Sequence, residues 1–179
     1  MNTSPRFITS YTYEDYQLWE GDWQLIDGVA VAMTPSPFGR HERVVGEIFG
    51  ELRQQLKDQG CDCRVYTGLD WIVSKDTVVR PDVMVVCGQQ PDRYLERPPV
   101  LAVEVLSSST RGLDLTTKRA IYQSAGVAYY LIVDPEGETV ELCDYREGKL
   151  SSQHGHGDKF DLRLDDHCHA TLVVEAMFR

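Results

Sequence analysis

The sequence has no long hydrophobic run and few basic residues for its number of acidic ones. No apolar stretch approaches the roughly 20 residues that span a bilayer, and the opening MNTSPRFITSYTYEDY lacks the basic-then-apolar pattern of a secretory signal. We therefore expect a cytoplasmic protein without a membrane segment. The chain has 18 basic and 28 acidic residues, a formal net charge of −10, which argues against a broad nucleic-acid-coating surface.

Local basic patches are compatible with this charge balance. Two clusters of basic side chains could form a small positive mouth or could be scattered, solvated charges. They are Arg40, His41 and Arg43, and Arg111, Lys118 and Arg119. Neither cluster decides between the two interpretations by itself.

Cysteine is also scarce, and the odd count of five argues against a disulfide framework in an intracellular chain of this length. Cys87 and Cys143 lie in apolar, strand-like runs, where cysteine behaves as a small core residue. We therefore expect reduced thiols. A competing hypothesis is a transition-metal site formed by His154, His156, His167, Cys168 and His169. Their spacing fits no closed or catalytic zinc motif, so we expect the histidines to face solvent.

Internal repeats and low-complexity tracts are absent too. A chain of 179 residues with 42% hydrophobic and 26% charged residues is long enough, and ordinary enough in composition, for one globular domain. We expect one domain over residues 1–179. Its expected parts are a core at about 37–145, an N-terminal helix and hairpin at 11–36, and a C-terminal extension at 146–179.

Hydrophobic periodicity predicts the elements of the first half of the chain. A short helix at 13–19 precedes a hairpin closed by Asp27-Gly28, a dipeptide that accepts positive φ. Apolar residues on one helical face predict a long helix that begins near Val44 and ends near Gly60. Two strand-like runs follow, at 63–73 and 77–86.

The second half predicts a crossover. An apolar strand at 100–106 is followed by a helix of about 12 residues ending near Gly126, and then by a hairpin of strands at 128–134 and 139–145. This helix is long enough to cross a sheet and join parallel strands. We therefore expect an α/β or α+β fold with a mixed central sheet flanked by helices.

Glu104 lies inside the apolar strand Val100–Leu106, where an unpaired carboxylate would be costly. Asp82 enters another apolar strand directly after Pro81. If the two strands are neighbours, a hard cation such as Mg²⁺ or Mn²⁺ could hold both acids in ionised form. Taken alone, Asp82 could instead be an ordinary turn-capping residue.

The helix after Glu104 supplies a basic partner. Asp114, Lys118 and Tyr122 recur every four residues and share a face, so Lys118 could point toward the carboxylates. An ammonium there would stabilise charge developing on a phosphorus centre. An ordinary surface pair of Asp114 with Lys118 is the competing interpretation.

Taken together, the ordered motifs resemble the Uma-two family of restriction-endonuclease-like proteins, within the PD-(D/E)xK nuclease superfamily. The resemblance covers roughly Tyr13 to Tyr145 and rests on the segments RPD, EVLSSST, a spaced Asp and Lys, and AGVAYYLIVDP. It implies a restriction-endonuclease-like core, a Mg²⁺ or Mn²⁺ cofactor, DNA as the substrate and a homodimer. By position, Asp82 matches the aspartate of the PD element and Glu104 the acid of the (D/E)xK element.

The sequence departs from the superfamily pattern at two positions. Leu106 replaces the lysine that usually follows the acid by two residues, and the resemblance implies that Lys118 substitutes for it. Gln24 stands where the family has glutamate in ELIDG. Glu47 lies where many members carry an extra acidic ligand, and His41 matches a histidine that could contact phosphate; Glu47 could equally be a solvated helix residue.

Three functional hypotheses follow. The first is a metal-dependent endonuclease in which Asp82 and Glu104 bind the metal and Lys118 orients or activates water. The second is a catalytically degenerate nuclease-fold module that binds nucleic acid or protein, which the net charge, Leu106 and Gln24 favour. The third takes Glu104 as a structural acid paired with a basic residue in the core.

Overall fold

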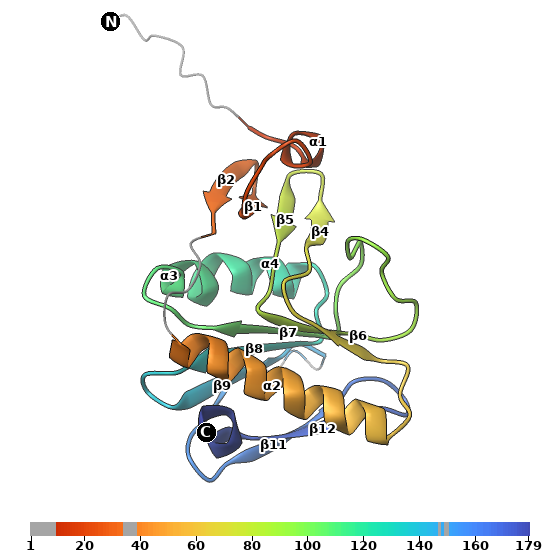
Figure 1. The fold of residues 1–179 in the computed structure, drawn as a ribbon, viewed down its shortest axis with the longest axis vertical. Coiled ribbons are helices and arrows are strands. Elements are labelled where there is room, and N and C mark those ends of the chain that lie inside the picture. The colour runs from red at the N-terminus through yellow and green to blue at the C-terminus, as the bar shows by residue number, and fades with distance from the viewer. Residues whose placement is uncertain (1–9, 34–38, 147, 149–150) are drawn as a thin grey trace, which may run out of the picture.

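The structure is a computed structural model that describes residues 10–33, 39–146, 148 and 151–179. It is a mixed α+β fold, and its largest sheet has six strands in the order β10-β9-β8-β7-β6-β3 (Figure 1). In that order the strands are Ser152–His154, Thr139–Asp144, Tyr129–Asp134, Leu101–Val105, Val83–Val86 and Arg64–Tyr66. β7 and β8 run parallel, and the other neighbouring strands are antiparallel.

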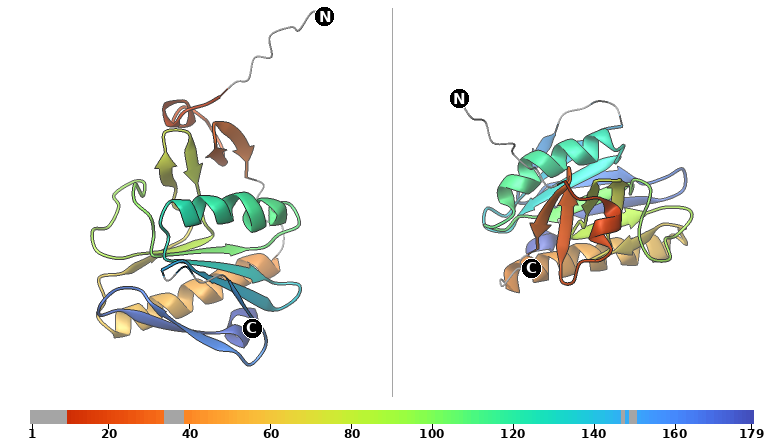
Figure 2. Two further views of the ribbon diagram at one scale, coloured as in Figure 1. Left: turned by 180° about the vertical axis from the view of Figure 1, so that it is seen from behind. Right: turned by 90° about the horizontal axis from the view of Figure 1, so that it is seen from above.

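Helices cover both faces of this sheet (Figures 1 and 2). On one side lies α2, Gly39–Asp58, and on the other lies a helical segment that crosses from β7 to β8. This crossover segment consists of α3, Arg111–Leu113, a π-helical turn η1, Asp114–Lys118, and α4, Arg119–Ser124. The expected crossover over a mixed sheet is therefore present.

Alternation along β7 decides which side chains meet which helix. Leu101, Val103 and Val105 belong to the core cluster that contains the buried face of α2. Ala102 and the following Leu106 belong to the second core cluster, with Tyr122 of α4. Because side chains of a strand alternate between its two faces, Glu104 points to the crossover side, as Ala102 does.

A second sheet of four strands, in the order β2-β1-β5-β4, stands beyond the crossover segment (Figure 1). Its strands are β1, Trp23–Ile26, β2, Val29–Ala32, β4, Trp71–Ser74, and β5, Thr77–Val79. The hairpin turn between β1 and β2 has positive φ at Asp27 and Gly28, 50° and 77°, as the dipeptide predicts. Helix α1, Tyr13–Tyr16, lies against this sheet through a hydrogen bond from Tyr13 N to Lys75 O.

The C-terminal hairpin packs beside α2 on the same face of the large sheet, where all three share one core cluster. It consists of β11, Lys159–Arg163, and β12, His169–Val173, followed by a 3₁₀ helix η2 at Val174–Phe178. Gln55 of α2 donates to Thr171 O at 2.7 Å and accepts from Thr171 N at 2.8 Å. Gln59 makes the same two bonds with His169, so two side-chain amides pair with the edge of β12 as a strand would.

The two long runs predicted as single strands are each divided into two, which corrects the sequence-based expectation. Gly68, at φ 63°, separates β3 from β4, and Pro81, which has no amide donor, separates β5 from β6. Each run therefore contributes one strand to the small sheet and one to the large sheet. Asp82 lies at this division, directly before β6.

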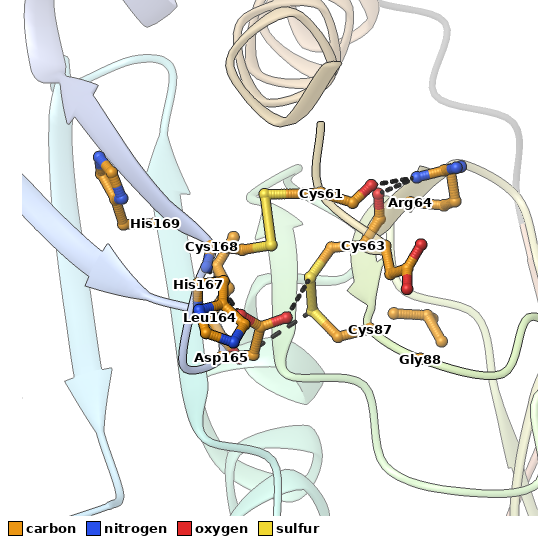
Figure 3. Close-up of a disulfide and its surroundings, with 12 residues drawn as sticks. Cys61, Cys63, Arg64, Cys87, Gly88, Leu164, Asp165, His167, Cys168 and His169 are labelled. Carbon is orange, nitrogen blue, oxygen red and sulfur yellow. Dashed lines mark hydrogen bonds between the residues drawn. A yellow bond between two sulfur atoms is a disulfide. The ribbon is translucent and has the colours of Figure 1, made fainter. Parts of the chain in front are cut away.

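The prediction of reduced thiols is wrong for four of the five cysteines. The structure contains disulfides between Cys61 and Cys168 and between Cys63 and Cys87, while Cys143 is free and buried, as predicted (Figure 3). The paired cysteines are 107 and 24 residues apart in the sequence, so the pairs could not be predicted from a local spacing of cysteines. Among the described residues, the one group of three ligand-type side chains close enough for a metal contains no histidine, so the histidine-rich site is not formed.

Candidate active site

Glu104 is 2% exposed in the central strand β7, facing the crossover segment. Its Oε1 lies 2.9 Å from the Nζ of Lys118. The Tyr122 hydroxyl donates to the same Oε1 at 2.6 Å. The buried acid therefore has a cationic partner and a neutral donor, both from the crossover segment.

Lys118 and Asp114 occupy the ends of the π-helical turn, and both are buried. The Lys118 Nζ lies 3.1 Å from the Asp114 Oδ1, so the lysine contacts two carboxylates at once. A π-helical turn is wider than an α-helical one and often occurs at functional sites. It stands where the sequence predicted a regular α-helical turn. The pair of Lys118 with Asp114 is buried and is not the surface pair that the sequence also allowed.

Asp82 lies beside this cluster at the start of β6. Its Oδ2 accepts a hydrogen bond from the backbone N–H of Val105, the residue after Glu104, at 2.8 Å. The same oxygen lies 3.4 Å from the Nε2 of His41, at the start of α2. The pairing of β6 with β7 thus places the two acids next to each other.

The acids open into a cavity of about 290 Å³. Its lining includes four residues that the sequence analysis assigned to the site, His41, Asp82, Glu104 and Lys118. It also includes Gln24, which replaces the glutamate expected from the family resemblance. Gln24 is 3% exposed and accepts a hydrogen bond from the backbone N–H of Arg80 at 3.3 Å, so this wall of the cavity carries a neutral amide.

Burial and the neighbouring charges shift the pKa values of Glu104 and Lys118. Burial raises the pKa of Glu104 to about 8, with Asp82 and Asp114 adding to the rise and Lys118 opposing it. For Lys118, burial acts to lower the pKa, but Glu104 and Asp114 outweigh it and raise the pKa above its ordinary value. Lys118 is therefore a fixed cation among acids.

Tyr122 and His41 are hydrogen-bond donors of the site. Burial and the neighbouring Glu104 raise the pKa of Tyr122 well above its ordinary value, so its hydroxyl stays protonated. Burial acts to lower the pKa of His41, but the hydrogen bond to Asp82 outweighs it and the net shift is upward. His41 can therefore present a positive charge to an anion in the cavity.

The acid pair fits a hard divalent cation. Within the described part of the chain, no hydrogen bond reaches Oε2 of Glu104 or Oδ1 of Asp82, so each carboxylate keeps an oxygen for a ligand. Mg²⁺ and Mn²⁺ prefer such oxygen ligands and take the remaining ones from water or phosphate. A cation between the acids would also offset the mutual repulsion that raises the pKa of Glu104.

Glu47, which the resemblance offered as an accessory acid, lies elsewhere. It is exposed on α2 and lines a groove with Leu172 and Met177 of the C-terminal segment, not the cavity of Asp82 and Glu104. The helical turn that buries Val44 and Ile48 points Glu47 away from the sheet. The structure therefore does not bring Glu47 into the cavity of the two acids.

Three of the four arginines in the two basic clusters of the sequence are paired with acids. Arg40 pairs with Glu138 at 2.6 Å, Arg111 with Asp134 at 3.0 Å, and Arg119 with Glu141. A positive mouth formed by these arginines is therefore not present in the described structure.

Hydroxyl side chains on the cavity rim were missed by the sequence analysis as site residues. Ser107, Ser109 and Thr110 line the cavity, with Ser107 Oγ 3.1 Å from Ser109 Oγ and 2.9 Å from Thr110 Oγ1. A run of four hydroxyl residues directly after a buried strand was the available signal. Such hydroxyls can both donate to and accept from a bound anion or its waters.

Comparisons with known proteins identify the family and a similar fold. Residues 13–165 match the Uma2 (Uma-two) family, described as "Putative restriction endonuclease", and the chain belongs to this family. The fold is similar to the crystal structure of a "putative nuclease belonging to DUF820" from Anabaena variabilis ATCC 29413. The two chains are 16% identical, with a TM-score of 0.75 over 93% of this chain and 97% of that one. The search of curated proteins gives no match.

The comparisons establish the family and a similar fold, and they assign no role to any single residue. Among the residues that the structure describes, no helix is both long and apolar enough to cross a membrane.

Proposed function

We propose that this chain is a divalent-metal-dependent endonuclease that hydrolyses DNA phosphodiester bonds within a restriction-endonuclease-like core. The observation that carries the proposal is the buried cluster of Glu104 and Lys118 beside Asp82, in one cavity. Membership of a family described as restriction endonucleases supports DNA as the substrate. The order of elements, a helix, antiparallel strands carrying both acids, a crossover helix and a parallel strand, supports the assignment of the core.

Asp82 and Glu104 would hold Mg²⁺ or Mn²⁺ through Oδ1 and Oε2. The metal, when bound, would supply Lewis-acid polarisation of the scissile phosphate. The Lys118 ammonium lines the cavity, where it orients an attacking water and stabilises negative charge developing on the phosphate oxygens. The lysine from the crossover segment thereby takes the place of the one replaced by Leu106.

The neighbouring groups position this machinery. Asp114 holds the ammonium from the far side, and Tyr122 fixes the rotamer of Glu104. His41, whose Nε2 faces Asp82 and whose Nδ1 faces Glu42, orients Asp82 and when protonated adds positive charge near a bound phosphate. Each of these residues acts through groups that the structure already places in contact.

The test measures Mn²⁺ binding by calorimetry and plasmid nicking, in wild type and in Asp82→Asn and Glu104→Gln. We expect both replacements to abolish Mn²⁺ binding and to lower the nicking rate by at least about 100-fold, because each removes a charged metal ligand. Glu47→Gln is the matched control: it removes an exposed helix acid outside the cavity and should leave both readouts unchanged. Wild type that neither binds Mn²⁺ nor nicks DNA would refute the proposal.

A catalytically degenerate module is the second candidate, favoured by the neutral Gln24 in the cavity wall and by the ion pair that already engages Glu104. It predicts that Glu104→Gln changes the free energy of unfolding and leaves nucleic-acid affinity unchanged. A structural role for Glu104 alone predicts the same change of stability with no effect on metal binding. The calorimetric comparison separates both from the nuclease.

Cleavage of both DNA strands requires two active sites, so we propose that the nuclease acts as a homodimer. Light scattering on the purified chain, with and without a DNA duplex, measures this directly. A monomer in both conditions would restrict the activity to nicking.

A further inference from the structure

Four of the five cysteines meet at one point (Figure 3), at the other end of β6 from Asp82. Cys61 and Cys63 lie between α2 and β3, Cys87 directly follows β6, and Cys168 directly precedes β12. The sulfur of Cys61 is bonded to that of Cys168, and the sulfur of Cys63 to that of Cys87. Three separate segments of the chain therefore converge on a single group of sulfur atoms.

Strand pairing explains the convergence of two of them. Arg64 of β3 pairs with Val86 of β6, and the same antiparallel register places Cys63 opposite Cys87, with their Cα atoms 3.9 Å apart. Cys168 is held in the turn between β11 and β12, where the Asp165 Oδ1 accepts hydrogen bonds from the N–H groups of His167 and Cys168. Backbone pairing and the hydrogen bonds of this turn thus bring the cysteines close together without any bond between their sulfur atoms.

Acceptor oxygens face three of the four sulfurs. The pairs are Cys63 Sγ with Asp165 Oδ2 at 3.4 Å, Cys61 Sγ with Gln59 Oε1 at 3.8 Å, and Cys87 Sγ with Leu164 O at 3.9 Å. A disulfide sulfur has no proton to donate, whereas a thiol has one. Once the disulfides are reduced, these three thiols each have an acceptor oxygen close by.

A basic cavity gives access to the cluster. Its volume is about 390 Å³, and Arg53, Lys57 and Arg64 line it together with Cys61 and Cys63. Arg64 Nη1 donates to the carbonyl oxygens of Cys61 at 2.6 Å and Cys63 at 2.9 Å, which fixes its positive charge beside the Cys-x-Cys segment. Positive side chains favour thiolate over thiol, and the thiolate is the form that binds metals.

We propose that the reduced chain binds one soft divalent cation, Zn²⁺, through the thiolates of Cys61, Cys63, Cys87 and Cys168. Each thiol releases its proton to solvent as the metal binds, and no electron is transferred. The Cys63 and Cys168 sulfurs and an Asp165 carboxylate oxygen all lie within 4.8 Å of one another. Ligand atoms on a tetrahedral zinc are about 3.8 Å apart, since each zinc–sulfur bond is about 2.3 Å, so the cluster needs only side-chain adjustment.

This metal would be structural, because all four coordination positions are filled by the protein. It would tie the C-terminal hairpin to β3 and β6. Cys168 lies beyond residues 13–165, which match the family, whereas the other three cysteines lie within them. The site therefore joins the matched part of this chain to a segment outside it.

The experiment begins with wild type purified with reductant and without chelator, in which zinc is measured by mass spectrometry. We expect about one zinc ion per chain. Exchange into Co²⁺ should give thiolate-to-cobalt charge-transfer absorption in the near ultraviolet, a signature that an oxygen-ligand site does not produce. Cys63→Ser and Cys168→Ser should lose both signals.

Two control variants should keep both signals. Cys143→Ser removes a buried free cysteine in β9, and Asp82→Asn removes an acid of the oxygen-lined cavity. Folded, reduced wild type that holds no zinc and gives no cobalt–thiolate band would overturn the proposal, whatever the variants do. So would zinc that persists undiminished in folded Cys63→Ser and Cys168→Ser. Because the first criterion uses wild type alone, a variant that fails to fold leaves the test intact.

Discussion

Strand β6 carries a different group of potential ligands at each end. Asp82 precedes it, within a cavity lined by carboxylates, a lysine and hydroxyls, and Cys87 follows it, within a cluster of sulfurs beside a basic cavity. The first group suits a hard cation bound by oxygen and the second a soft cation bound by sulfur. One short strand thus separates two groups of side chains that favour different classes of cation.

The two ends differ in how visibly the sequence displays them. A carboxylate inside an apolar strand is conspicuous because its burial is costly without a partner. A cysteine in the same setting resembles any small core residue, so Cys87 gave no signal. A site built on a buried carboxylate can thus be predicted from the sequence of one strand. A site built on cysteines can be predicted only when it is known which strands pair.

The largest expected effect comes from removing the cation of the oxygen-lined end. Lys118→Met leaves Glu104 and Asp114 buried without their shared partner, and we expect the free energy of unfolding to fall by about 3–5 kcal/mol in urea denaturation. Arg40→Met is the control, because Arg40 is exposed and pairs with Glu138 at the surface, where such pairs contribute about 0–1 kcal/mol. Equal effects would show that the buried cluster has no special role in stability.

Breaking the sulfur end is expected to rank second. Cys168→Ser removes a crosslink between positions 107 residues apart, and we expect a loss of about 2–4 kcal/mol in the same measurement. Cys143→Ser, a buried cysteine outside the cluster, should lose less. If both replacements cost the same, the cluster contributes only packing.

Tyr122→Phe sharpens the account of Glu104. Its hydroxyl donates to Glu104, and above about pH 9, where a carboxyl with a pKa of about 8 is ionised, loss of this hydrogen bond to a charged acceptor is expected to cost about 1.5–3 kcal/mol in urea denaturation. Tyr130→Phe is matched in size and burial, but its hydroxyl donates to the carbonyl oxygen of Asp114, a neutral acceptor, for about 0.5–1.5 kcal/mol. A larger loss at Tyr130 would contradict a charged Glu104.

The smallest effect concerns the turn that anchors the crossover segment. Burial acts to raise the pKa of Asp134, but hydrogen bonds from Gly137, Arg111 and Glu136 outweigh it and hold the pKa below its ordinary value. A lowered folded pKa contributes stability that is present above the unfolded pKa, about 3.9, and is lost as pH falls through the folded value.

Asp134→Asn should therefore lower stability at neutral pH by about 0.5–1 kcal/mol, and the difference from wild type should shrink below about pH 3. Denaturation at several pH values measures it, with Asp92→Asn, at an exposed loop position, as the control. A difference that stays constant with pH would assign the effect to something other than ionisation.

Much of the fold was predictable because local signals agree with the tertiary structure. Asp27-Gly28 closes its hairpin, Gly60 follows α2 at a positive φ, and the crossover segment joins two parallel strands. The division of two runs between two sheets was not predictable from periodicity, because both halves of each run have a strand-like pattern of residues. Only the pairing of β1 with β5 reveals that the chain leaves one sheet for the other.

For the candidate site, the sequence predicted which residues meet but not how they are held. Asp82, Glu104 and Lys118 share one cavity, as expected from the motifs. The wider π-helical turn, the buried position of Asp114 and the amide role of Gln24 depend on packing that a sequence does not display. Glu47 was misplaced because its helix buries a different face.

The packing of the C-terminal hairpin beside α2, on one face of the large sheet, has a consequence for synthesis on the ribosome. Gln55 and Gln59 bind β12, and Cys61 binds Cys168, so one side of α2 is completed by residues translated more than 100 positions later. Until then, the apolar surface that β12 and η2 cover is open to water and to other nascent chains. We expect chaperone dependence during synthesis to end only when residues 159–178 emerge.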